Sequence, residues 1–172
     1  VESPEVEVAR VVDLVLEHAA HRGGESLMVV TASYKHAVRV QQAVLRALTK
    51  RGDLTEFFTR DNPEPFMVLT LDQATAHSRD RVILSIGYGR TPHGRTLSSF
   101  GTLGQPGGER LLAAAMTRAR RSLVVVSCFR PADIDEDRLD GGIVALGRIL
   151  ADAEARTAQE QIPDDSDAML VD

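Results

Sequence analysis

The sequence has 172 residues, of which 43% are hydrophobic and 26% are charged, and its formal net charge is −5. A chain of this length can bury the core of one compact domain. It has no apolar run near the ~18 residues that a membrane span needs, and its start lacks the basic-then-apolar layout of a signal peptide. We therefore expect a cytoplasmic protein without a membrane partner. The single cysteine, Cys128, can form neither an intramolecular disulfide nor a CxxC metal site.

The first part of the chain predicts a helix, a strand and a second helix. Ser3 is expected to cap the first helix, with Pro4 in its first turn, and apolar residues then recur at helical spacing. Residues 26–32 are a β-branched run of strand length, and residues 34–52 form an amphipathic helix. A short helix is expected at 54–58. This alternation is typical of α/β proteins.

Three further strands are predicted, at residues 66–71, 80–88 and 121–129. Each is nearly continuous in apolar residues, which indicates strands covered on both faces in a mainly parallel sheet. The segment "ERLLAAAMTRARR" (109–121) and residues 143–157 predict two more helices. The predicted fold class is therefore α/β, with three layers and helices on both faces of the sheet.

The charge is unevenly distributed along the chain. Residues 158–172 carry five acids and no base, so we expect an acidic, largely disordered tail after a domain that spans residues 1–157. Residues 79–121 hold eight arginines and two acids, a local excess of six positive charges. Such a concentration fits a surface that meets phosphates, and the alternative is an ordinary solvated basic face.

Three of these arginines stand beside the most apolar predicted strand, in the stretch "AAAMTRARRSLVVVS". If the helix continues through them, Arg118 and Arg121 share a face while Arg120 points elsewhere. An arginine at this position could reach from the domain edge into a neighbouring domain. The alternatives are a stem packed on apolar surface with its guanidinium in water, or a favourable charge near a helix C-terminus.

Several catalytic motifs are absent. The sequence has no GxxxxGK[ST] phosphate loop, no HExxH and no GxSxG, so a self-contained hydrolase of those types is not expected. The acidic turn "DIDEDRLD" (133–140) supplies carboxylates, but a solvated turn explains it, and no metal site is predicted.

The segments "TLDQATAHSRDRVILSIGYGRTPHGR" and "GGERLLAAAMTRARRSLVVVSCF" resemble the later motifs of superfamily 1 helicases, in the branch that includes RNA-decay and Okazaki-processing helicases. The resemblance implies a RecA-like fold, the second (C-terminal) of two such domains. ATP and Mg would then be held with an N-terminal RecA-like domain that carries the phosphate loop. Single-stranded nucleic acid would run across both domains, and DNA and RNA both stay open as partners.

The resemblance also implies roles for particular residues. Arg118 matches the arginine of the "TRA" motif, an arginine finger on the γ-phosphate, with Thr117 beside it. Tyr34 matches the region where the family's fourth motif touches the nucleotide or strand. The composition of the glycine-rich loop 89–108 adds two stacking candidates, Tyr88 just before the loop and Phe100 within it, which otherwise anchor the loop in the core. The expected nucleic-acid contacts are Arg90, His93, Arg95 and Arg121.

The chain departs from the helicase pattern at two places. Where the family has "QGxE", this sequence has Thr75, Ala76, His77 and Ser78, and Ala113 replaces the usual asparagine before "TRAR". These departures support an alternative, a degenerate and non-catalytic module that binds nucleic acid or a protein. In either case we expect the isolated domain to have no ATPase activity.

Overall fold

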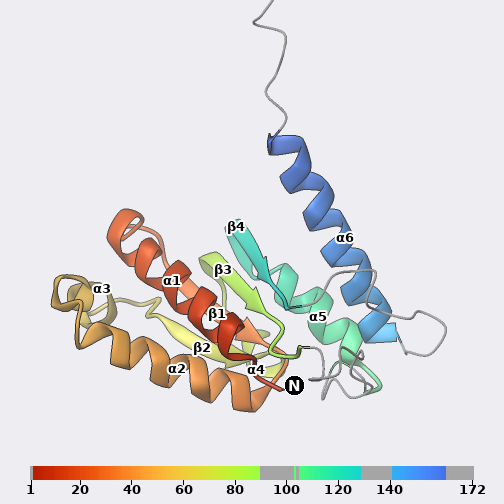
Figure 1. Ribbon diagram of the computed structural model, residues 1–172, viewed down its shortest axis with the longest axis horizontal. Coiled ribbons are helices and arrows are strands. Elements are labelled where there is room, and N and C mark those ends of the chain that lie inside the picture. Colours follow the sequence, from red (N-terminus) through yellow and green to blue (C-terminus); the bar gives the residue numbers. More distant parts are fainter. Residues whose placement is uncertain (1, 90–102, 104, 129–140, 162–172) are drawn as a thin grey trace, which may run out of the picture.

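The computed structural model describes residues 2–89, 103, 105–128 and 141–161 (Figure 1). In chain order the elements are α1 (Glu5–His21), β1 (Leu27–Thr31), α2 (Tyr34–Leu48), the 3-10 helix η1 (Gly52–Leu54), α3 (Thr55–Thr59), β2 (Met67–Thr70), α4 (Leu71–Ala74), β3 (Arg79–Ser85), α5 (Gly108–Met116), β4 (Ala119–Val126) and α6 (Gly141–Gln161).

The four described strands form one sheet in the order β2-β1-β3-β4, and every pair is parallel. All five residues of the central strand β1 are buried. This burial explains the continuous apolar run in the sequence, because a strand covered on both faces has no solvent side on which to place polar residues. The predicted parallel sheet is confirmed.

Helices cover both faces of the sheet, so the predicted three-layer α/β arrangement is confirmed (Figure 1). On one face α1 and α2 pack against Leu27 and Val29. On the other face α4, α5 and α6, with α6 packed on α5, share a core with Met28 and Val30. The alternation of these four residues follows from the two-residue period of a strand.

The start of α1 differs from the prediction. Pro4, not Ser3, is the N-cap residue, and Ser3 has a positive φ of 55°. The Ser3 hydroxyl lies 2.9 Å from Nδ1 of His36, so this side chain serves a tertiary contact and not a helix cap. A serine caps the next helix, because the Ser33 hydroxyl accepts a hydrogen bond from the His36 backbone N–H.

The junction between α5 and β4 also differs from the prediction. The helix ends at Met116 and the strand begins at Ala119, so Arg120 and Arg121 lie on the strand. The helical arrangement expected for the three arginines is therefore wrong. The strand begins here because Ala119 pairs with Arg79 of β3, whose backbone N–H donates to the Arg118 carbonyl over 3.1 Å.

The last described helix, α6, continues to Gln161. It therefore extends four residues into the segment predicted as the acidic tail. Residues 162–172 lie outside the described part of the chain.

Candidate functional site

Arg118 lies between the end of α5 and the start of β4, with a partly exposed side chain. Its Nη1 donates to the Thr75 carbonyl over 3.4 Å, and its Nη2 donates to Oγ1 of Thr117 over 3.2 Å. Thr117 is itself fixed, because its hydroxyl donates to the Ala114 carbonyl over 2.8 Å. Among the described residues no carboxylate pairs with Arg118, so its charge is available to an anion from outside this part of the chain.

Arg120 and Arg121 are in a different situation. Arg120 forms ion pairs with Glu64 and with Asp80, the latter at 2.9 Å. Arg121 lies 3.5 Å from a carboxylate oxygen of Glu25. The Arg120 contacts join the loop before β2 to the N-terminal end of β3. We therefore assign Arg120 a structural part, while Arg121 as a nucleic-acid contact stays a prediction.

Arg79 belongs to the same basic stretch, but it is only 4% exposed. Its guanidinium donates to the carbonyls of Pro65 and Ser78 at 2.8–3.1 Å. These contacts satisfy a buried cation with backbone dipoles and leave it inaccessible to phosphate. The positive excess counted along residues 79–121 is therefore used in part inside the protein.

The structure does not bring Tyr34 and Arg118 together. Tyr34 begins α2 just after the C-terminal end of β1, and Arg118 directly precedes the N-terminal end of β4. In a parallel sheet these positions lie at opposite ends of the strands, and a five-residue strand such as β1 spans about 16 Å. Tyr34 is 72% exposed, so its ring is free to meet a partner at its own edge.

The predicted contacts Arg90, His93 and Arg95 lie outside the described residues, as does Phe100. Tyr88 is described and is 7% exposed, packed in the core on the α5 side of the sheet. For Tyr88 the anchoring alternative is therefore the one that the structure supports.

The structure shows a buried polar network that the sequence did not predict, at the C-terminal ends of β1 and β3. The Ser85 hydroxyl and the Gly87 backbone N–H donate to Oε1 of Glu7 over 2.7 and 2.8 Å. Nε2 of His36 lies 2.7 Å from the Ser85 hydroxyl oxygen, and its Nδ1 contacts Ser3. Ser3, Glu7, His36 and Ser85 are each at most 1% exposed.

The position of this network matters for ligand binding. In the order β2-β1-β3-β4 the direction of strand succession reverses between β1 and β3, and open α/β sheets bind ligands outside the C-terminal ends of such strands. Here Glu2 forms an antiparallel bridge with Tyr88 and accepts a hydrogen bond from Ser33 over 2.8 Å. Residues of the chain itself therefore occupy the crevice at the C-terminal ends of the strands. Arg118 lies at the other end of the sheet, beside the N-terminal end of β4.

The hydrogen bonds of the network define its protonation. The Ser85 hydroxyl donates its hydrogen bond to Glu7, so it can only accept from His36. Nε2–H of His36 therefore donates to Ser85, and Nδ1 accepts from the Ser3 hydroxyl. Burial, and then the charge of Arg39, lowers the pKa of His36 to about 4. Burial raises the pKa of Glu7, although hydrogen bonds from Gly87 and Ser85 favour its charged form. The network is therefore built around a neutral imidazole.

This pKa predicts loss of stability in mild acid. Between pH 6.5 and about 4, His36 is protonated in the unfolded chain but neutral in the folded chain. The contribution of neutral His36 to the free energy of unfolding is therefore complete above pH 6.5 and is lost as the pH falls toward 4. The expected loss from this group is about 3 kcal/mol at pH 4. Glu7 acts in the opposite direction, since its raised pKa makes it stabilise the fold as the pH falls toward 4.5.

Urea unfolding from pH 7 to 4 measures this effect against His36→Gln, which keeps a polar side chain but cannot titrate. The slope of stability against pH should be smaller in the variant, because Glu7 and every other group titrate in both proteins. Parallel curves would show that His36 does not carry the acid sensitivity.

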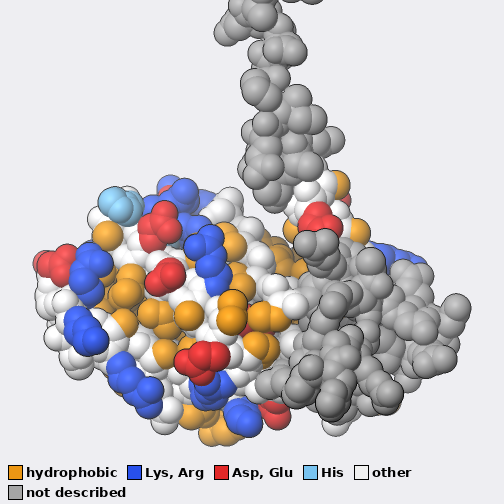
Figure 2. Space-filling view, viewed as in Figure 1, with side chains coloured by type: hydrophobic (Ala, Val, Ile, Leu, Met, Phe, Trp, Pro, Cys, Tyr) orange, Lys and Arg blue, Asp and Glu red, His pale blue; other side chains and the backbone are white. Residues whose placement is uncertain are grey.

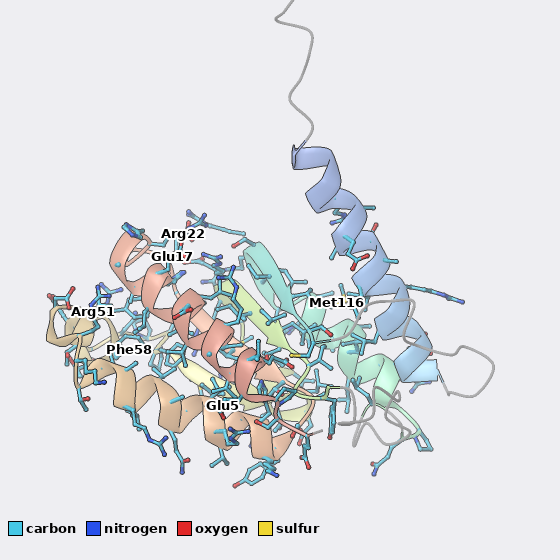
Figure 3. The ribbon with its side chains drawn as sticks, viewed as in Figure 1. Glu5, Glu17, Arg22, Arg51, Phe58 and Met116 are labelled. Atoms are coloured by element: carbon cyan, nitrogen blue, oxygen red, sulfur yellow. The ribbon has the colours of Figure 1, made fainter. Side chains whose placement is uncertain are left out.

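One groove adjoins β4, which is at the edge of the described sheet. It has a volume of about 520 Å³ and lies between β4, the end of α5 and α6, beside Met116 (Figure 3). Its charged residues, Asp152 and Arg156, pair with each other at 2.9 Å. The groove therefore offers shape and apolar surface but no group for catalysis.

No cluster of metal-binding side chains occurs among the described residues. Burial, and then the charge of Glu7, raises the pKa of the Cys128 thiol to about 11, so little of the reactive thiolate forms at neutral pH. Of the described helices, none combines the length and apolar character needed to cross a bilayer.

No protein-family model and no curated protein matches the chain. Among solved structures, the chain is similar to the C-terminal domain of a possible DNA helicase from Lactobacillus plantarum WCFS1. The two are 16% identical with a TM-score of 0.42, over 83% of this chain and 78% of that one. The fold assignment rests on the sheet order and the covering helices described above.

Proposed function

We propose that this chain is the second RecA-like domain of a superfamily 1 helicase-like ATPase, and that it supplies Arg118 as an arginine finger to an ATP site. One observation carries the proposal. The arginine that the "TRAR" motif predicts as the finger has no carboxylate partner among the described residues, whereas Arg120 and Arg121 are paired with Glu64, Asp80 and Glu25.

The chemistry follows from the guanidinium group. Arginine keeps its charge at every physiological pH and presents a planar fork of N–H donors, which suits two oxygens of one phosphate. Arg118 sits on a short connection between a helix and a strand, and Thr117 and Thr75 orient it. These two hydrogen bonds are long and involve neutral acceptors, so a phosphate oxygen would compete well for the same donors.

The remaining parts of the site would come from the N-terminal RecA-like domain of the same full-length protein. That domain would hold ATP and Mg, and the metal would neutralise charge on the transferred phosphate. Arg118 and Thr117 would face the γ-phosphate only when the two domains close. Hydrolysis would thus depend on the relative position of the domains, and single-stranded nucleic acid spanning both could control it.

A second candidate is a non-catalytic module that binds nucleic acid or a protein. The observation in its favour is the lack of a carboxylate at the "QGxE" position. There Thr75 offers only its carbonyl to Arg118, and the Ser78 hydroxyl accepts from Arg120 over 3.3 Å. In that case the same surface would bind ligands without assisting hydrolysis.

ATP hydrolysis by a protein that contains both domains separates the two candidates. The proposed function requires a large loss of nucleic-acid-stimulated hydrolysis in Arg118→Ala. Equal rates with and without the substitution would favour the non-catalytic module.

A further inference from the structure

The segment from Thr31 to Gly52, which contains α2, holds five bases and no acid, in a chain whose net charge is −5. Four of the bases, Lys35, Arg39, Arg46 and Lys50, are four, seven and four residues apart, so they fall on one side of the helix and the turn after it. We call these four residues the α2 basic stripe. Figure 2 shows Lys and Arg side chains in a row over this helix.

Three members of the stripe are free to meet a ligand. Lys35, Arg46 and Lys50 are exposed, and within the described part of the chain none of them has an ion-pair partner. Arg39 is held by Glu5, with which it forms an ion pair, and by Ser3. This contrasts with residues 79–121, where Arg79 is buried and Arg120 and Arg121 form ion pairs at the surface.

A second row of residues runs beside the stripe. Tyr34, Val38 and Leu45 are 72%, 37% and 55% exposed, at spacings of four and seven residues. Next to them is a groove of about 440 Å³ between α2 and the edge strand β2, lined in part by the amides of Gln41, Gln42 and Gln73. The surface thus combines separated cations, an exposed aromatic ring and amide groups that can both donate and accept hydrogen bonds.

We propose that the outer face of α2 binds single-stranded nucleic acid, with the phosphates on the α2 basic stripe and bases against Tyr34 and the adjoining groove. The charges match those of a polyanion, and single strands are bound by cations that follow the backbone together with rings on which bases stack. An acidic protein segment would pair with the cations, but it has no bases to stack on Tyr34 or to form hydrogen bonds with the amide groups. This proposal rests on the proposed function only for the choice of single-stranded nucleic acid as the partner. It does not involve Arg118.

The steps of the helix support this arrangement. Lys35 and Arg39, and again Arg46 and Lys50, are separated by about 6 Å along the helix axis, and the whole of α2 is about 22 Å long. Several consecutive nucleotides can therefore lie along one helix. The Lys50 backbone N–H donates to the Ala47 carbonyl over 3.1 Å, so the turn continues and keeps Lys50 in line with Arg46.

The test is binding of a fluorescein-labelled oligothymidylate of about 20 nucleotides to the 172-residue chain, followed by fluorescence anisotropy at about 50 and about 200 mM salt. The first variant combines Lys35→Gln, Arg46→Gln and Lys50→Gln. Its matched control combines Arg10→Gln, Arg110→Gln and Arg148→Gln, three exposed bases outside the stripe, which remove the same charge. All six positions are exposed, and circular dichroism is the check that both variants are folded.

The stripe variant should bind at least about tenfold more weakly at low salt, and its slope of log affinity against log salt should be smaller by about 2, because three phosphate contacts are lost. Tyr34→Ala should weaken binding about tenfold and Tyr34→Phe should restore it, because stacking needs the ring and not the hydroxyl. The control should bind like the unchanged chain, and none of these results depends on ATP hydrolysis.

Three results would overturn the proposal. The first is no binding by the unchanged chain at low salt. The second is equal weakening in the stripe variant and its control, which would show a response to net charge alone. The third is displacement of the oligonucleotide by polyglutamate as effectively as by unlabelled oligothymidylate, combined with no effect of Tyr34→Ala, which would assign the surface to an acidic protein partner.

Discussion

Arg118→Ala, in a protein that carries both RecA-like domains, is expected to slow nucleic-acid-stimulated ATP hydrolysis by about 10³-fold or more. The loss is large because the finger acts on charge that develops in the transition state, in a closed site where water cannot replace it. The measurement is the turnover rate at saturating ATP and saturating single-stranded nucleic acid. The Michaelis constant for ATP should change much less than the turnover rate, since the partner domain supplies most of the ground-state binding.

Two controls give this prediction its specificity. Arg118→Lys keeps the charge but loses the planar fork, so it should recover only a small part of the lost rate. Arg110→Ala removes an exposed arginine from α5, the helix that precedes Arg118, and should leave the rate unchanged. Within the described part of the chain, the Arg118 side chain donates hydrogen bonds to the Thr75 carbonyl and the Thr117 hydroxyl alone, so its removal should not unfold the domain. A folded Arg118→Ala protein with an unchanged rate would remove Arg118 from the reaction.

The layers of the fold could be predicted from the sequence, because burial on both faces leaves a continuous apolar run for each strand. The fully buried β1 is the clearest case. The end of α5 could not be predicted, since the alanines before Thr117 favour a helix and the arginines after it are compatible with one. The pairing of Ala119 with Arg79, forty residues earlier in the chain, ends the helix instead.

The sequence predicted Arg118 by its motif but not the state of its neighbours. Arg120 pairs with Glu64, which is fifty-six residues away, and no local sequence pattern predicts a pairing over that separation. Glu7 resembles an ordinary acid in the first turn of a helix, where the dipole favours negative charge, yet it is buried against Ser85. The charge distribution along the sequence predicted a basic surface at residues 79–121. Residues 31–52 also hold bases and no acid, and the structure shows that most of these bases are exposed on or next to α2.

Gly87→Ala is expected to lower the free energy of unfolding by about 2–5 kcal/mol, for two separate reasons. Gly87 has a φ of +82°, where a side chain costs about 1–2 kcal/mol. In addition, a Cβ at this position would lie 2.8 Å from Cβ and 2.9 Å from Cγ of His36, and such overpacking costs about 1–3 kcal/mol. The measurement is urea unfolding at pH 7.

Gly107→Ala is the matched control for the backbone. Gly107 has nearly the same φ, +87°, but no heavy atom of the described residues, its own chain neighbours aside, lies within 4 Å of the position that a Cβ would take. It should therefore lose only the backbone contribution of about 1–2 kcal/mol. The difference between the two variants measures how firmly Ser3 and Ser85 hold the His36 ring over the end of β3. Equal losses would mean that the His36 ring can move aside at little cost.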